Sequence, residues 1–267
     1  EILSSYTYTL DPNGNITQVL QEEPLSPWVP PVTTDLTYNS FKNRLLSADS
    51  TGWFGQGSTN FTYDAEGQIL TKDTTSYDDE GQPLTKDTTS YSFDYEHRLK
   101  SISRSDSATT FVYDGRGTRL QATHNSIVTR YIYDARGNLI AETDANNNIT
   151  KYYIYGRGLL AMVTPQGETY TYHYNGVGST IAMTDENKSV VNKYSYTPFG
   201  LINNQEETLA QPFKYVGKYG IMSEGNGFYY MRARYYNPEV GRFISEDPLG
   251  LDVGVNLYAY CSNNPVN

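Results

Sequence analysis

The sequence predicts an all-β protein built from tandem antiparallel β-hairpins. A short motif recurs along the chain, turn-forming residues stand in every copy, and the dominant aromatic residue favours strands. The 267 residues include 26 tyrosines but only 9 phenylalanines and 2 tryptophans, and 37% of all residues are hydrophobic. Tyrosine can bury its ring while its hydroxyl meets water or a partner, and it is enriched in strands. We therefore expect sheets with partly wet faces rather than one thick apolar core.

The motif reads aromatic-x-Tyr-Asp-x-x-Gly-x-x-Leu/Ile. Copies begin at Phe61, Thr75, Phe111 and Tyr131, and only the second departs from the motif, with Thr at its first position. A degenerate copy with Phe for Tyr and no glycine begins at Phe93, and eroded relatives begin at Tyr6 and Tyr38. The string LTKDTTSY occurs twice without change, at 70–77 and 84–91, which suggests duplication of a short hairpin unit. Hairpins in tandem, at a spacing of about 20 residues, are typical of an antiparallel β-repeat.

Each copy has the chemistry of a strand, a turn and a returning strand. In the copy that begins at Tyr131, alternating side chains give the strand two different faces. Asp134 can accept backbone N–H groups of the turn, and Gly137 supplies the positive φ that closes it. We interpret the motif aspartates, including Asp64 and Asp114, as turn formers rather than catalytic acids. The tyrosine rows are interpreted as packing between strands, with stacking on sugars as the alternative.

Only one short segment has a composition that suits a helix. Residues 203–210 could form a turn or two, and the rest of the chain is expected to lack helices. The prediction is therefore a β-hairpin array with almost no helical content.

The charge balance argues against a nucleic-acid partner. The chain carries 20 Lys and Arg against 30 Asp and Glu, a net charge of −10, whereas nucleic-acid affinity depends on cationic contacts. No stretch approaches the roughly 18 apolar residues of a membrane span. The start, EILSSYTYTL, lacks the features of a signal peptide and is expected to come from the middle of a longer protein.

No cofactor, metal site or internal disulfide is expected. The single cysteine, Cys261, has no partner within the chain. The three histidines, His97, His124 and His173, are scattered and lack the spacing of metal ligands. These residues are most simply explained as surface or strand residues.

The repeats resemble the tyrosine-aspartate (YD) repeats of the Rhs (rearrangement hotspot) family. The C-terminal third resembles the core-associated module of that family through PFKYVGKYG, GFYYMRARYYNPEVGRFISEDPLGL and NLYAYCSNNPVN. The resemblance is loose from Tyr6 to about Asp144 and close from about Tyr194 to Asn267. It implies two parts: a hairpin array over residues 1–193 that forms part of a spiralling β-shell, and a core-associated plug over residues 194–267.

The resemblance also implies a function. Rhs proteins, the C components of Tc toxins and the teneurins build a hollow β-shell, which in the bacterial members encloses a variable toxic C-terminal domain. The plug closes one end of the shell and cuts the chain just beyond itself. We therefore expect a secreted or cell-surface bacterial protein whose partners are a C-terminal toxin domain as cargo and secretion-apparatus proteins, such as those of type VI secretion. Because 267 residues make only part of a shell, exposed strand edges should pair with the rest of the shell or with copies of this chain.

Two residues are the candidate catalytic site of this self-cleavage. By resemblance, Asp247 in the string DPLGL is the acting carboxylate and Arg234 in RARYY is its partner. Hydrolysis of a peptide by carboxylates needs one ionised and one protonated group, and an adjacent arginine keeps one of them ionised. Asp252 and Glu246 are the only other acids nearby in the sequence. The resemblance places the second acid and the scissile bond beyond Asn267, so this chain is expected not to cleave itself.

Other interpretations of the same residues stay open. Arg232, Arg234 and Arg242 could simply pair with Asp247, Glu246 or Glu239 and lock the plug in place. Asn237 stands where the family usually has aspartate, which preserves a turn but removes an acid. An adhesin-like β-array that binds glycans or a protein partner is the alternative function. An independent hydrolase is least favoured, since the sequence contains no triad, metal cluster or phosphate loop.

Overall fold

The computed structural model describes residues 5–22, 32–39, 42–52, 55–78 and 80–265. Ser40 and Phe41, inside the eroded motif copy at Tyr38, lie outside the described residues, as do Val266 and Asn267. Nearly all regular structure is strand, which confirms the predicted all-β class. Within the described part of the chain, no helix has the length and apolar character needed to cross a membrane.

In the described residues, eighteen antiparallel strands form one large sheet, which we call the wall. Its strands are β1 (Ser5–Leu10), β2 (Ile16–Glu22), β3 (Val32–Tyr38), β4 (Leu45–Gly52), β5 (Gly55–Tyr63), β6 (Ile69–Tyr77), β7 (Pro83–Phe93), β8 (Leu99–Ser103), β9 (Ala108–Tyr113), β10 (Arg119–His124), β11 (Ile127–Tyr133), β12 (Leu139–Thr143), β13 (Ile149–Gly156), β14 (Gly158–Val163), β15 (Thr169–Tyr174), β16 (Thr180–Thr184), β17 (Val190–Tyr196) and β18 (Ile202–Glu207).

The remaining elements belong to residues 208–265, which we call the tail. They are β19 (Met222–Ser223), β20 (Tyr229–Met231), β21 (Arg234–Asn237), β22 (Arg242–Phe243) and the short 3-10 helices η1 (Gly217–Tyr219), η2 (Gly250–Val253) and η3 (Cys261–Asn263).

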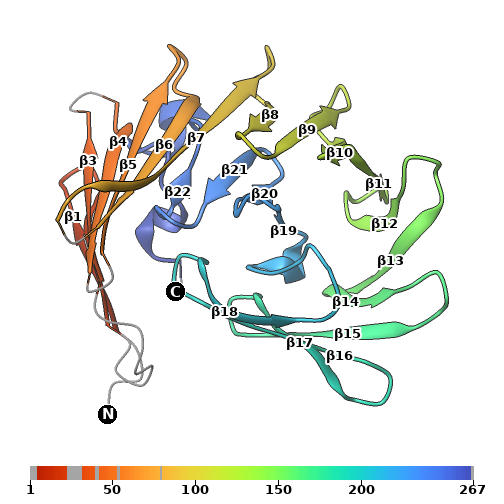
Figure 1. Cartoon of the computed structure of the whole chain (residues 1–267). Coiled ribbons are helices and arrows are strands. Elements are labelled where there is room, and N and C mark those ends of the chain that lie inside the picture. Colours follow the sequence, from red (N-terminus) through yellow and green to blue (C-terminus); the bar gives the residue numbers. More distant parts are fainter. Residues whose placement is uncertain (1–4, 23–31, 40–41, 53–54, 79, 266–267) are drawn as a thin grey trace.

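The wall is a continuous meander. Each strand pairs with the strand before it and the strand after it in the sequence, from the β1–β2 pair to the β17–β18 pair. Figure 1 shows that the sheet curls round and that the tail strands β19 to β22 lie inside its curve. This curved, open sheet is the partial shell that the sequence predicts.

The turns form as the motif predicts. At Asp134, the side-chain Oδ1 accepts the backbone N–H groups of Arg136 at 2.8 Å and Asn138 at 2.9 Å. These bonds lower the pKa of Asp134, and the bond from the Asn138 N–H contributes most. Gly137 has φ 79°, a conformation that costs a glycine little. The degenerate copy without glycine makes the same turn, with His97 at φ 63° in the glycine position.

Further turns of this kind lie beyond the predicted motif copies, and two of them begin at a residue other than aspartate at the tail end of the array. After β15, Oδ1 of Asn175 accepts the N–H of Ser179 at 2.9 Å, and after β17, Oγ1 of Thr197 accepts the N–H of Leu201 at 3.1 Å. In these turns asparagine and threonine replace the motif aspartate. The hairpin array therefore continues well past residue 144.

The motif tyrosines tie neighbouring hairpins together. Four tyrosines at this position donate their hydroxyls to the backbone carbonyl at the start of the returning strand of the previous hairpin. The four bonds run from Tyr38 to Ile16, Tyr113 to Leu99, Tyr174 to Leu159 and Tyr196 to Thr180, at 2.7–2.8 Å. These contacts support the packing interpretation of these tyrosines over sugar stacking.

Consecutive turns of a meander lie alternately at its two ends. We call the end that faces the tail the tail rim, and it is made by the nine turns that join each odd-numbered strand to the next even-numbered one. The motif copy that begins at Thr75 makes its turn, from Asp78 to Gln82, between β6 and β7 and therefore lies at the opposite rim.

The helix predicted at 203–210 is wrong. Residues 202–207 form β18, which pairs with β17 and places Lys193 opposite Glu206, with an ion pair of 3.3 Å between them. Pairing with a neighbouring strand overrides the local composition. Because β17 runs from Val190 to Tyr196 and β18 ends at Glu207, the sheet continues across the boundary expected between residues 193 and 194.

Candidate active site between the wall and the tail

The tail is held by aromatic side chains rather than by long strands. Tyr215, Tyr229, Tyr236 and Phe243 form a buried cluster, and neighbouring rings in it lie 5.5–6.5 Å apart. Tyr229 donates its hydroxyl to the carbonyl of Gly200 at 2.8 Å, which anchors the cluster to the last turn of the wall. Burial raises the pKa of the Tyr215 hydroxyl to about 12.

A tight hairpin positions Arg234. Strands β20 and β21 pair so that Met231 lies opposite Arg234, which leaves Arg232 and Ala233 as a two-residue loop. Arg232 has φ 60°, in the left-handed region that side chains other than glycine rarely adopt. Such conformations persist only where the surrounding structure imposes them, and they cluster at functional sites.

The structure brings the two candidate residues together. The Arg234 Nη2 atom lies 2.6 Å from Oδ2 of Asp247, and both side chains are largely buried, with exposed fractions of 13% and 14%. Arg234 also donates Nη1–H to the carbonyl of Leu257 at 2.9 Å, and its guanidinium lies 3.6 Å from the centre of the Phe243 ring. Burial lowers the pKa of Arg234, and the attraction of Asp247 opposes that shift.

The other acids near Asp247 have different partners. Glu246 accepts hydrogen bonds from Arg44 and from the Tyr258 hydroxyl, each at 3.2 Å, and so joins the tail to the wall. Glu239 pairs with Lys72 of β6. Asp252 lies in η2.

Of the ion pairs considered for the three tail arginines, the described residues contain only that between Arg234 and Asp247. Arg242 instead donates to the carbonyl of Asn43 at 2.6 Å and lies 4.8 Å from the ring centres of Tyr38 and Tyr258. Arg232 donates to the carbonyl of Tyr219 at 3.5 Å.

A cavity of about 310 Å³ opens beside Asp247, and we call it the acidic pocket. The tail contributes Arg234, Glu246 and Asp247, and two turns of the tail rim contribute Glu66 and Glu96. Several carboxyl groups around one cavity can provide the ionised and protonated pair that peptide hydrolysis requires. Among the described residues, no group of three or more His, Cys, Asp or Glu could hold a metal ion.

A buried ion pair that the sequence reasoning missed also joins the wall to the tail. Arg119, 1% exposed, pairs with Glu224 of the tail, with Nη1 and Oε1 2.5 Å apart. The Arg119 guanidinium also lies 4.2 Å from the centre of the Tyr230 ring. In six other hairpins the position after the turn is aliphatic and buried, at Ile16, Leu45, Ile69, Leu99, Leu139 and Leu159. A charged residue, Arg119, at a position that is otherwise aliphatic was the sequence feature that could have predicted this ion pair.

The tail covers most, but not all, of the tail rim. A Cβ atom built on Gly67 would lie 2.1 Å from Glu246, and Cβ atoms built on Gly158, Gly178 and Gly200 would meet Lys218, Tyr219 and Tyr215 at 2.5–2.8 Å. At Gly137 a Cβ atom would meet nothing within 4 Å. The turn at 134–138 therefore stays clear of the tail, and an opening remains there.

Comparisons with known proteins agree with this architecture. The family model described as Teneurin YD-shell matches residues 3–266. The toxin protein Tse5 of Pseudomonas aeruginosa is 54% identical over 56 residues, which cover 21% of this chain and 4% of that protein. The tRNA nuclease WapA of Bacillus subtilis is 36% identical over 187 residues, 66% of this chain and 8% of that protein. The chain therefore spans less than a tenth of the length of these two relatives.

A solved structure shares the fold. In the crystal structure of TcdB2-TccC3, a matching region covers 100% of this chain and 17% of that one, with a TM-score of 0.54 and 17% sequence identity. At this identity the likeness shows the fold alone.

Proposed function

The chain belongs to the family of YD-shell proteins, and from this premise we propose that it forms part of the wall and the plug of a β-shell that encloses a toxic domain. The observation that carries this proposal is the tail seated inside the curve of an open hairpin sheet (Figure 1). The names of Tse5 and WapA support a toxin as the protein to which such a shell belongs. The protein is proposed to be a secreted or cell-surface bacterial toxin.

The rest of the shell is proposed to pair with the outer strands of the wall. Among the described residues, the register of β1 joins it to β2, and that of β18 joins it to β17. Unpaired strand edges readily pair with other strands, so neighbouring hairpins of a longer shell are suitable partners. Secretion-apparatus proteins are proposed as the further partners that deliver the shell.

Encapsulation can be tested by limited proteolysis of the full-length protein. A toxic domain inside the shell should resist a protease that digests the same domain when it is produced alone. Electron microscopy should then show density inside a hollow shell. A toxic domain that is digested at equal rates in both forms would contradict encapsulation.

We also propose that Asp247 and Arg234 carry out self-cleavage of the full-length protein. Asp247 is proposed to supply a carboxylate at the acidic pocket, Arg234 to fix its position and charge, and a second carboxyl group to hold the proton that polarises the scissile carbonyl. The contact of 2.6 Å between the two side chains supports this assignment.

The test is the mass of the purified full-length protein and of three variants. The wild-type protein should give two pieces, whereas Asp247→Asn and Arg234→Gln should each give one. Asp252→Asn is the matched control, because it removes a neighbouring acid outside the acidic pocket, and it should give two pieces. If Asp247→Asn is cleaved as fully as the wild-type protein, Asp247 is not the acting acid.

A further inference from the structure

The part of the tail rim that the tail leaves uncovered opens into two adjoining cavities. One, of about 530 Å³, is lined by Arg98, Arg116 and Arg232 together with Tyr133. The second, also about 530 Å³, is lined by Arg157, Lys218 and Arg232. Because Arg232 lines both, the two cavities meet at its side chain, and we call them together the basic groove.

The basic groove concentrates positive charge in an acidic protein. Five of the 20 Lys and Arg residues line it, although the chain has a net charge of −10. Among the residues that the structure describes, Glu96 is its one acidic lining residue, and it is already paired with Arg98 at 2.9 Å. Within the part of the chain that the structure describes, the four other cations form no ion pair; they are Arg116, Arg157, Lys218 and Arg232.

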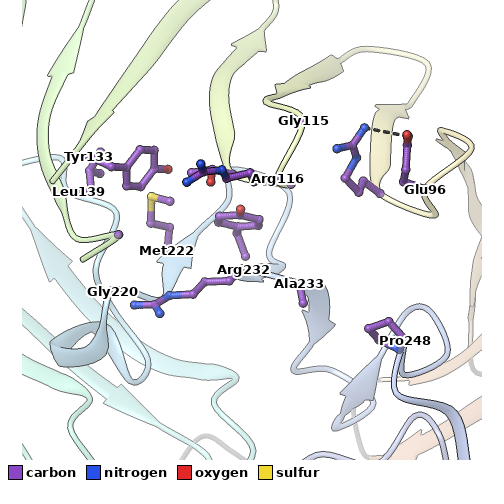
Figure 2. A pocket seen from close by; sticks show the side chains of 15 residues that line it. Glu96, Gly115, Arg116, Tyr133, Leu139, Gly220, Met222, Arg232, Ala233 and Pro248 are labelled. Atoms are coloured by element: carbon purple, nitrogen blue, oxygen red, sulfur yellow. Dashed lines mark hydrogen bonds and ion pairs between the residues drawn. The ribbon is translucent and has the colours of Figure 1, made fainter. Parts of the chain in front are cut away.

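The groove also offers a hydrogen-bond donor that has no partner. The Tyr133 hydroxyl is buried and has no hydrogen-bond partner among the described residues. Figure 2 shows this hydroxyl and the Arg116 side chain pointing toward one another, while Arg232 extends toward Gly220. The equivalent hydroxyls of Tyr113 and Tyr174 bond to backbone carbonyls, so Tyr133 departs from the pattern of the wall.

The lining leaves room for a chain to approach the backbone. Gly115, Gly117, Gly137 and Gly220 line the first cavity. Cβ atoms built on Gly115 and Gly137 would meet nothing within 4 Å. The left-handed Arg232 at the tip of its hairpin places one of the unpaired cations where the two cavities join.

We propose that the basic groove binds an extended polypeptide segment rich in Asp and Glu. Arginine pairs with carboxylates through two parallel hydrogen bonds, and the unpaired Tyr133 hydroxyl can donate a further one. An extended segment suits two cavities in series better than a single small anion does. A phosphate backbone is the other extended polyanion that such a groove could bind, and the oligonucleotide in the test below distinguishes it from the peptide.

The groove adjoins the acidic pocket, since Glu96, Ala233 and Pro248 line both. A segment bound in the groove would therefore extend toward Asp247. Its binding needs no cleavage step, so this inference stands or falls separately from the proposed activity.

The test measures peptide binding to the 267-residue chain by fluorescence anisotropy. The probe is a labelled twelve-residue synthetic peptide of Glu, Asp, Gly and Ser, and the comparison peptide carries Gln and Asn in place of Glu and Asp. The acidic peptide should bind, and Arg116→Gln/Arg232→Gln should weaken its binding by about tenfold or more. Tyr133→Phe should weaken it several-fold without lowering the melting temperature, because the lost hydroxyl has no hydrogen-bond partner among the described residues.

The control variant is Lys100→Gln/Lys188→Gln, which removes two exposed cations outside the groove and should bind as the wild-type chain does. Equal binding of the two peptides, or no loss of binding in Arg116→Gln/Arg232→Gln, would overturn the proposal. Tighter binding of a single-stranded oligonucleotide of equal charge would overturn it as well, since the groove would then be a general polyanion site.

Discussion

The wall and the tail reach their structures by different means. Wall strands are 5–11 residues long and pair with their neighbours in the sequence, and the same turn chemistry recurs in several hairpins. Tail strands are 2–4 residues long, and Val216, Arg232, Cys261, Ser262 and Asn263 all have positive φ. The wall is thus stabilised mainly by backbone ladders, whereas the tail is stabilised by side chains that reach into the wall.

This difference predicts where single substitutions should lower the stability of the protein most. In a repeated ladder, each contact has many equivalents, and the loss of one changes little. A tail held by a few specific side chains depends strongly on each of them. Substitutions at contacts between wall and tail should therefore have larger effects than equivalent substitutions within the wall.

The largest effect is expected at the buried pair of Arg119 and Glu224. Glu224→Gln leaves the Arg119 charge buried without its counterion, which should lower the free energy of unfolding by about 3 to 5 kcal/mol. Urea denaturation measures this loss. Arg119→Leu/Glu224→Leu should regain much of it, because leucine occupies the same register at Leu99 and Leu139. A single variant as stable as the wild-type chain would show that the pair does not hold the tail.

The next effect is loss of stability at alkaline pH. Burial raises the pKa of Tyr215 in the tail to about 12 and does the same for Tyr63 in the wall. The folded state therefore favours the neutral hydroxyl, and this contribution is complete below pH 10 and lost as the pH rises through 12. For Tyr215, the rise in pKa from 10 to about 12 corresponds to a loss of about 3 kcal/mol in the free energy of unfolding at high pH.

Urea denaturation at several pH values between 9 and 12 measures the alkaline effect. Tyr215→Phe keeps the ring and removes the titrating group, so its stability should fall less steeply over this range. An identical slope in the variant and the wild-type chain would exclude Tyr215 as a source of the effect.

A smaller loss of stability is expected from alanine substitutions in the turns of the tail rim, and its size should depend on whether the tail covers the turn. Gly67 and Gly137 have similar φ values, 86° and 79°, so an alanine at either should cost about 1 kcal/mol of backbone strain. Gly67→Ala should cost about 1 to 2 kcal/mol more, because the new Cβ displaces Glu246 and Tyr258 from their hydrogen bonds. Thermal unfolding of both variants checks this difference. Equal losses would show that the tail does not press on the Gly67 turn.

The smallest effect lies within the wall. Tyr174→Phe removes the bond to the Leu159 carbonyl and should cost about 1 kcal/mol. Tyr133→Phe changes the same motif position but removes a hydroxyl that has no partner in the described part of the chain, so its unfolding free energy should match that of the wild-type chain. Chemical denaturation of the two variants provides the measurement. A larger loss for Tyr133→Phe than for Tyr174→Phe would refute the view that these hydroxyl bonds tie neighbouring hairpins together.

Local sequence was sufficient to predict the wall, because its turn chemistry lies within five consecutive residues. The copy at Phe93 shows how far this extends, since His97 takes the glycine position and the turn still forms. The turns at Asn175 and Thr197 were missed because the aspartate was treated as essential, although any side-chain oxygen at that position can accept the turn N–H groups. The helix expected at 203–210 failed because β17 supplied a pairing partner.

The candidate site was less accessible to sequence reasoning. The resemblance supplied Asp247 and Arg234, and the structure places them in contact. The pairing of Arg119 with Glu224 joins residues 105 positions apart, and the acidic pocket draws Glu66 and Glu96 from separate hairpins. Such contacts depend on how the wall curves around the tail, which no short stretch of sequence encodes.

The duplicated string LTKDTTSY places a constraint on how such a wall can change in length. Its two copies, at 70–77 and 84–91, lie on the paired strands β6 and β7 and are offset by 14 residues, which is one strand and one turn rather than a complete hairpin. Loss of a single such unit would reverse the direction of every later strand. The turns at Gly14 and Gly67 would then lie at one end of the sheet and those at Gly178 and Gly200 at the other, beyond the reach of a single tail. Viable insertions and deletions in this wall must therefore come in even numbers of strands.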